Sequence, residues 1–267
     1  SRKYGLTGEP GVTTDPLFTD AYSGTGSTYK YFTLLAALNA GADQTLSLTT
    51  PGNTYTPRHC SQKGSALVPL HNAGNYADTM TLRSATIQSS NTYFVALEDQ
   101  VFGCDLSPIV NMAKSLGVNS LNDVQDNGQT VGSNVVAGTA YTYTLGQTAT
   151  SALEMASAYG AVANDGVYCP PDPIVSVTDA AGQPVAFTKP ACTRPIDPLI
   201  ARTALDIMTG DTRPGEAGTA TGAFGSYYGR GGSPIAGKTG TNNDADDKCN
   251  AALWFVGVTP HLTASTA

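Results

Sequence analysis

Long hydrophobic runs, basic clusters and metal-ligand spacings are all missing from this sequence. The longest apolar stretches, such as residues 251–256, have the length of a strand, so any membrane anchor is expected outside this chain. The chain has 14 basic against 21 acidic residues and no basic run, which argues against a nucleic-acid or anionic-membrane partner. No Cys-x-x-Cys pair occurs, so we predict neither a metal site nor a cofactor.

The five cysteines have two interpretations. Cys169 and Cys192 flank a predicted hairpin and are our first candidate disulfide, and Cys60 with Cys104 is the second, which would leave Cys249 free. Two disulfides and one free thiol would suit an exported protein. The alternative is five buried thiols in a reducing compartment.

The chain has 267 residues with 29 glycines and 16 prolines, which indicates a compact, loop-rich α/β protein with a sizeable core. Hydrophobic periodicity and capping residues predict helices over residues 29–38, 92–98 and 106–116, from 151 to near 166, and from 197 to 210. Residues 42–80 are predicted to be irregular and residues 211–232 to form a surface loop. A hairpin is predicted over 174–187, and three strands over 234–240, 251–258 and 261–267.

Three short motifs stand in order along the chain. They are Ser-Thr-Tyr-Lys at 27–30, Ser-Ser-Asn at 89–91 and Lys-Thr-Gly-Thr at 238–241. The first is the only Ser-x-x-Lys and the third the only Lys-Thr-Gly in the chain, and each supplies a different part of one reaction. Together they predict a site for serine acyl transfer.

Ser27 and Lys30 are the predicted nucleophile and base. A serine hydroxyl needs an adjacent base, and Lys30 lies one helical turn beyond Ser27 on the same face. The positive end of the helix dipole and burial both disfavour a protonated lysine, and a neutral Lys30 can take the serine proton. The alternative is a purely structural role, in which the serine caps a helix beside a solvated lysine.

The second motif offers Ser89 to relay the proton and Asn91 to orient Lys30 or hold a substrate carbonyl. Alternatively these residues only cap the helix predicted from residue 92. A second Ser-x-Asn begins at Ser120, in a polar segment after Gly117, and is interpreted as part of a turn.

The third motif lies on a predicted strand. Lys238 would stabilise anionic intermediates, and the hydroxyls of Thr239 and Thr241 would bind a substrate carboxylate. Gly240 would let a ligand approach the strand closely. The backbone N–H groups of Ser27 and Thr241 are the predicted oxyanion hole. The alternative is a tight turn at the end of a strand.

A serine hydrolase of the Ser-His-Asp kind is disfavoured. The chain has only three histidines (His59, His71 and His261) and no Gly-x-Ser-x-Gly elbow, so each histidine is interpreted as structural or exposed.

The chain resembles the transpeptidase domain of a penicillin-binding protein over nearly its whole length. The resemblance rests on the segments 26–38, 89–94, 153–159, 237–241 and 254–260. The segment 143–146 is similar to the bifunctional class A enzymes, and residues 2–5 and the cysteine pattern are similar to actinobacterial members.

The resemblance implies a penicilloyl-serine transferase (β-lactamase-like) fold of the α+β class. Such a fold has a five-stranded antiparallel sheet flanked by helices, beside a helical lobe. Its first two strands have no counterpart before Ser27 and are expected ahead of residue 1. The chain would thus be one N-terminally incomplete transpeptidase domain, 1–267, without a glycosyltransferase domain.

The resemblance also implies a serine D,D-transpeptidase that cross-links peptidoglycan stem peptides ending in D-Ala-D-Ala. It implies acylation of Ser27 by β-lactams, contact with other cell-wall synthesis proteins and an extracytoplasmic location at the outer face of the bacterial membrane. A D,D-carboxypeptidase, a penicillin-binding sensor without turnover and an inert wall-binding module remain alternatives. A β-lactamase is disfavoured because no Glu-x-x-Leu-Asn segment for deacylation is found.

Overall fold

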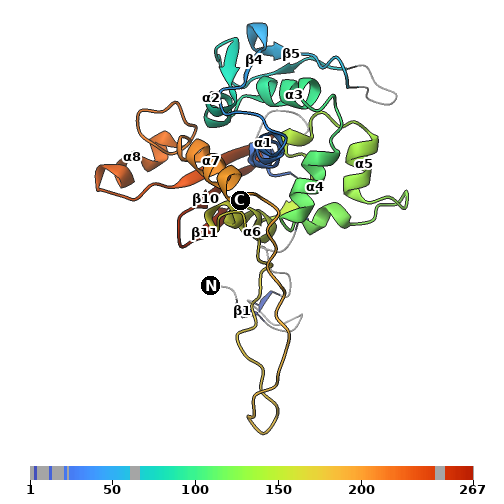
Figure 1. The fold of residues 1–267 in the computed structure, drawn as a ribbon, viewed down its shortest axis with the longest axis vertical. Helices are drawn as coiled ribbons and strands as arrows, with labels where there is room; N and C mark the ends of the chain where they lie inside the picture. The colour runs from blue at the N-terminus through green and yellow to red at the C-terminus, as the bar shows by residue number, and fades with distance from the viewer. Residues whose placement is uncertain are drawn as a thin grey trace.

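The structure is a computed structural model that describes residues 24–60, 67–243 and 250–266. It also describes the backbone of three short strands ahead of them: β1 (Lys3–Tyr4), β2 (Val12–Thr13) and β3 (Ala21–Tyr22). An antiparallel sheet lies beside a group of helices (Figure 1), which confirms the predicted mixture of helix and sheet.

The sheet is formed near the C-terminus by β9 (Ala236–Asn243), β10 (Asn250–Val258) and β11 (Thr263–Thr266). The strand order is β11-β10-β9, and both pairs are antiparallel. These are the three strands predicted over 234–240, 251–258 and 261–267. Within the described residues, the two further strands implied by the resemblance do not appear in this sheet. Strand β9, which carries the third motif, therefore lies at an edge of the described sheet.

Helix α1 (Lys30–Asn39) runs through the centre of the molecule (Figure 1), where the sequence predicts a helix over 29–38. It is buried from Lys30 to Leu38 because apolar or small side chains cover almost its whole circumference. The helix packs against α3, α4 and α7, whose bounds follow, and the 3-10 turn η1 (Gly26–Tyr29) leads into it. The first motif is thereby fixed between the helices and the sheet.

The other predicted helices are confirmed within a few residues. They are α3 (Asn91–Gln100), α4 (Ser107–Ser115), α6 (Ala152–Ala163) and α7 (Pro198–Thr209). Their N-termini show why the sequence was informative: Ser151 and Glu154 form the expected capping box on α6, and the Asp197 carboxylate accepts the Leu199 N–H at the start of α7.

Several elements differ from the predictions. The segment 211–232, predicted as a loop, contains α8 (Thr221–Gly229), and the ring of Phe224 packs 5.3 Å from that of Phe255 on β10. The glycines of this segment have a low helix propensity, which is why the sequence predicts a loop here. Two further helices, α2 (Leu82–Ile87) and α5 (Val131–Ala137), were not predicted from the sequence.

The predicted irregular segment 42–80 holds two short strand pairs. One joins β4 (Ser47–Thr49) to β7 (Thr79–Thr81), and the other joins β5 (Thr54–Tyr55) to β6 (Leu70–His71). A third short pair joins β3 to β8 (Thr150–Ser151), and further 3-10 turns are η2 (Pro51–Asn53), η3 (Asn119–Asn122) and η4 (Tyr143–Leu145). Strands of two or three residues carry too little alternation to be recognised in a sequence.

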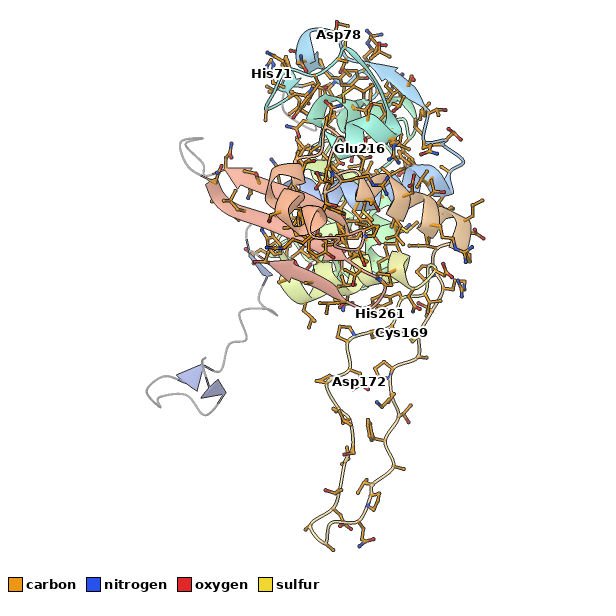
Figure 2. The ribbon with its side chains drawn as sticks, turned by 90° about the vertical axis from the view of Figure 1, so that its left-hand side faces the viewer. His71, Asp78, Cys169, Asp172, Glu216 and His261 are labelled. Atoms are coloured by element: carbon orange, nitrogen blue, oxygen red, sulfur yellow. A yellow bond between two sulfur atoms is a disulfide. The ribbon has the colours of Figure 1, made fainter. Side chains whose placement is uncertain are left out.

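Residues 169–192 form a long arm that projects from the body (Figures 1 and 2). The predicted turn is present, because the Gly182 N–H donates to the Asp179 carbonyl, but the arm contains only an isolated bridge between Thr178 and Pro184 and no extended strand. Figure 2 shows Cys169 at the body end and Asp172 further out along the arm.

Both predicted disulfides form. Cys169 pairs with Cys192 across the base of the arm, and Cys60 pairs with Cys104 just beyond α3. Cys249, predicted to be free, lies outside the described residues. In the part of the chain that the structure describes, no helix combines the length and the apolar character needed to cross a bilayer.

We expect Ser151→Ala to lower the free energy of unfolding by about 1 kcal/mol, because it removes the hydroxyl that caps the Glu154 N–H. The matched control is Ser157→Ala in the same helix, whose hydroxyl bonds only to the Leu153 carbonyl one turn earlier. Urea denaturation compares the two. Equal stabilities for both variants would show that the capping box contributes nothing.

Candidate active site

A cavity of about 710 Å³ opens where the edge of β9 meets η1 and the turn between α2 and α3. Most of the predicted site residues line it: Ser27, Ser89, Asn91, Thr239, Gly240 and Thr241. Lys30 and Lys238 are buried next to this lining, at 0% and 1% exposure. The three motifs, far apart in the sequence, therefore form one site.

Ser27 lies in the 3-10 turn η1, one step ahead of the α-helix that begins at Lys30. Side chains three residues apart are eclipsed in a 3-10 helix, so this turn aligns Ser27 with Lys30 more closely than an α-helix does. The turn is anchored from behind, since the Thr25 and Gly26 N–H groups both donate to the Gly146 carbonyl, at 2.9 and 3.2 Å. The backbone of Ser27 is thus held by the hydrogen bonds to Gly146 before it and by helix α1 after it.

Two glycines allow η1 to lie directly on β9. A Cβ at Gly26 would collide with the backbone of Thr241, and one at Gly240 would collide with the Thr25 carbonyl. The predicted reason for Gly240 was close approach of a ligand. The structure adds a second reason, because the space that a side chain would fill is already occupied by the backbone before Ser27.

The Lys30 amine is the centre of the site. Its Nζ lies 2.9 Å from Ser27 Oγ, 2.7 Å from the Ser89 carbonyl oxygen and 2.7 Å from Asn91 Oδ1, with Ser89 Oγ at 3.3 Å. The carbonyl and amide oxygens can only accept hydrogen bonds. A neutral amine would donate its two hydrogens to them and turn its lone pair toward the Ser27 hydroxyl.

The two buried lysines have different electrostatic surroundings. Burial holds the pKa of Lys30 well below its ordinary value, and the charge of Lys238 lowers it further. Burial also lowers the pKa of Lys238, but the negative charge of Asp211 acts in the opposite direction. A pair of groups whose surroundings differ in this way can divide the roles of base and cation. Lys30 is suited to be the base and Lys238 the cation.

The second motif both caps and contributes to the site. Ser89 follows Gln88, the C-cap of α2, and the hydrogen bonds from the Ser89 N–H to the Thr86 carbonyl and from the Ser90 N–H to the Ala85 carbonyl close a Schellman motif. The Ser90 hydroxyl then caps α3 by accepting the Tyr93 N–H. Because Ser90 does the capping, the side chains of Ser89 and Asn91 on either side are free to face Lys30.

Strand β9 presents the third motif at the cavity. The Thr239 N–H donates to Asp211 Oδ2 at 3.2 Å, on the side of the strand away from β10. N–H groups two residues apart in a strand point the same way, so the Thr241 N–H points to this same edge, against which Gly26 packs. The Thr241 N–H therefore lies at the strand edge next to η1, and its role with the Ser27 N–H as an oxyanion hole stays a prediction.

Sequence reasoning missed Asp211 and Thr219. Asp211 follows α7, is 1% exposed and accepts both the Thr219 N–H and the Thr239 N–H, while Thr219 lines the cavity beside Thr239. Neither residue belongs to a short motif, and both lie in a glycine-rich stretch interpreted as a loop. Only the fold brings this stretch to the edge of β9.

The other residues considered do not line this cavity. Ser120 is in η3, does not line this cavity, and donates its N–H to Glu154. His71 contributes its carbonyl oxygen to the Asn91 side chain. In the described residues, the group close enough to share a metal ion is Cys60, Asp99 and Cys104, and its two sulfurs form a disulfide, so they cannot act as thiolate ligands.

One further motif match was overlooked in the sequence. Residues 232–239 read Gly-Ser-Pro-Ile-Ala-Gly-Lys-Thr, the spacing of a phosphate-binding P-loop. A P-loop must lead from a strand into a helix whose first N–H groups hold the phosphates. Here Lys238 lies inside strand β9, so the match has no phosphate-binding geometry.

Comparison with known proteins places this geometry in a family. Residues 6–266 match the family model of the penicillin binding protein transpeptidase domain, and the chain belongs to this family. The relatives include penicillin-binding protein 1A of Clostridium acetobutylicum, 26% identical over 243 residues, and of Mycobacterium tuberculosis, 28% identical over 254 residues. They cover 90% and 93% of this chain but only 27% and 28% of the relatives' own length. The expected likeness to class A enzymes, actinobacterial members included, is confirmed.

Solved structures confirm the fold. The D,D-transpeptidase domain of a peptidoglycan glycosyltransferase from Eggerthella lenta has a TM-score of 0.70 at 25% identity, covering 97% of this chain and 62% of that one. Penicillin-binding protein A from M. tuberculosis, as its penicillin G acyl-enzyme complex, has a TM-score of 0.70 at 23% identity, with coverages of 97% and 57%. The fold is thus the penicilloyl-serine transferase fold that the resemblance implied.

We expect Ser89→Gly to be more stable than Ser89→Ala by about 1 kcal/mol, because Ser89 has a φ of +60°, a conformation that only glycine adopts without strain. Both variants lack the hydroxyl that faces Lys30, so the comparison isolates the backbone. Urea denaturation of the two proteins provides the measurement. A more stable alanine variant would show that the backbone at residue 89 carries no strain.

Proposed function

We propose that this chain is a serine D,D-transpeptidase unit over 1–267, and that its substrates are peptidoglycan stem peptides ending in D-Ala-D-Ala. Ser27 Oγ attacks the carbonyl of the penultimate D-Ala, and the terminal D-Ala leaves. An amino group of a neighbouring stem peptide then attacks the acyl-enzyme ester, which forms the cross-link and frees Ser27. The family supports serine acyl transfer in general, and the D-Ala-D-Ala specificity is our proposal.

The observation that carries the proposal is the surroundings of the Lys30 amine. Its two short contacts to acceptors leave the nitrogen lone pair for the Ser27 hydroxyl at 2.9 Å. A general base must lie within hydrogen-bond reach of its proton and must be unprotonated at the working pH. The position of Lys30 meets the first condition, and its lowered pKa favours the second.

The other site residues have roles in the same reaction. Ser89 Oγ, 3.3 Å from the Lys30 amine, relays the proton to the leaving D-alanine amine. The Ser27 and Thr241 N–H groups stabilise the oxyanion, and Lys238 adds positive charge beside it. Thr239 and Thr241 face the end of the substrate that carries the carboxylate.

A β-lactam would acylate the same serine, because its leaving group stays attached and blocks the second step. Acyl-enzyme complexes of M. tuberculosis penicillin-binding protein A with penicillin G, ceftriaxone and imipenem support this expectation. We further propose an extracytoplasmic location, with a membrane anchor outside this chain and contacts to other cell-wall synthesis proteins. Two disulfides in the described residues suit that compartment.

We expect benzylpenicillin to add one stable adduct to the wild-type chain, and none to Ser27→Ala, because only the Ser27 hydroxyl can form the ester. Intact-mass measurement followed by peptide mapping tests this. Circular dichroism of both proteins controls for folding. The absence of an adduct on folded wild-type protein would refute the proposal and favour an inert wall-binding module.

Turnover of a peptide substrate distinguishes a transpeptidase from a D,D-carboxypeptidase and from a sensor domain. A stem-peptide mimic ending in D-Ala-D-Ala is supplied with and without an amine acceptor. Transfer to the amine supports the transpeptidase, release by water alone indicates a D,D-carboxypeptidase, and an adduct without turnover indicates a sensor domain.

The pH dependence of acylation tests Lys30 as the base. Because the pKa of Lys30 is lowered, its amine stays neutral at pH values where an ordinary lysine is protonated. We therefore expect the acylation rate to fall only when the pH drops through that lowered pKa. Lys238→Met removes the neighbouring positive charge, so the pKa of Lys30 rises and the inflection moves to higher pH. Thr241→Val is the control, which lowers the rate without moving the inflection. An inflection unmoved by Lys238→Met would contradict this assignment.

A further inference from the structure

A chain of hydrogen bonds runs from a buried carboxylate to the cavity. Asp211 Oδ1 accepts the Thr219 hydroxyl at 2.5 Å, and the Thr219 hydroxyl oxygen lies 2.5 Å from that of Thr239. Thr219 and Thr239 both line the cavity, whereas Asp211 is buried behind them. The chain therefore connects a fixed negative charge to one of the two threonines expected to bind the substrate.

The Asp211 carboxylate is held firmly in this position. In addition to the Thr219 hydroxyl, it accepts the Thr219 N–H at 2.8 Å and the Thr239 N–H at 3.2 Å. The Asp211 carbonyl accepts the Ala220 N–H at 3.0 Å, and Gly218 packs so closely that a Cβ there would collide with Asp211 backbone atoms. A carboxylate with several donors around it acts only as an acceptor.

The number of hydroxyl protons determines in which direction the hydrogen bonds of this series point. Each threonine hydroxyl has one proton to donate. The Thr219 proton is directed at the Asp211 carboxylate, so the bond between the two threonines must use the proton of Thr239. The Thr239 oxygen is then left with its lone pairs toward the cavity.

We infer that Asp211 and Thr219 are positioning residues that make Thr239 Oγ1 a hydrogen-bond acceptor toward the cavity. This inference rests on the proposed function and refines it. Donation to the substrate carboxylate falls to Thr241, while Thr239 presents a hydrogen-bond acceptor to the cavity. Thr239 can donate to a carboxylate only by giving up its bond to Thr219. Asp211 and Thr219 thereby limit how strongly the site prefers a ligand with a carboxylate to a ligand with an uncharged group in its place.

The test is Thr219→Val, which keeps the side-chain shape and the N–H bond to Asp211 but removes the competing acceptor. Acylation rates are measured with benzylpenicillin and with its methyl ester, which lacks the carboxylate. We expect the ratio of the two rates to rise roughly three- to tenfold in favour of the free acid, the effect of one additional hydrogen bond. Thr239 would be free to donate to the carboxylate.

Two further variants make the result specific. Thr221→Val is the matched control: its hydroxyl bonds to the Glu216 carbonyl, away from the chain, and the ratio should stay at the wild-type value. In the double variant Thr219→Val with Thr239→Val the gain should disappear, because the proton donor itself is gone.

A purely structural role for Thr219 predicts a different result, in which both rates fall together and the ratio does not change. That outcome, or a fall in the ratio, overturns the inference while the proposed function stands. A wild-type chain that is not acylated by either compound would instead refute the proposed function, and this inference with it.

Discussion

The turn η1 can lie against strand β9 only because neither chain has a side chain at the point of contact. Gly26 faces the backbone of Thr241, and Gly240 faces the carbonyl of Thr25. This close approach puts the candidate nucleophile and the candidate oxyanion hole at one strand edge. It also buries Lys30 and Lys238 near each other, and the negative charge of Asp211, which acts on Lys238, makes their electrostatic surroundings different. A methyl group at either glycine would separate the parts of the site.

Burial of the two lysines carries a cost that the surrounding polar atoms offset. An isolated buried ammonium is strongly disfavoured, so a buried lysine needs hydrogen-bond partners, an opposite charge or a neutral state. Lys30 has the carbonyl of Ser89 and the amide of Asn91, and Lys238 has the charge of Asp211. The backbone strain at Ser89 belongs to the same arrangement, because its left-handed conformation accompanies the carbonyl contact to Lys30.

Much of this could be predicted from the sequence, and the failures have physical causes. The long helices and the C-terminal strands carry clear periodicity and caps, and the three motifs named the residues that the fold brings together. Helix α8 was missed because its three glycines give it a low helix propensity, and its contact with Phe255 cannot be read from a local pattern. Asp211 and Thr219 were missed because their role depends on a contact with β9 that no local pattern reveals. The contact between Gly240 and the Thr25 carbonyl was missed for the same reason.

The arm between Cys169 and Cys192 has a consequence for proteolysis. Its extended, largely exposed backbone is open to a protease, whereas the disulfide at its base joins the two ends of the arm covalently. A single cut within the arm would therefore add one water to the mass without releasing a fragment. The two pieces would separate only after reduction and unfolding, so a nicked molecule could keep both halves of its site together.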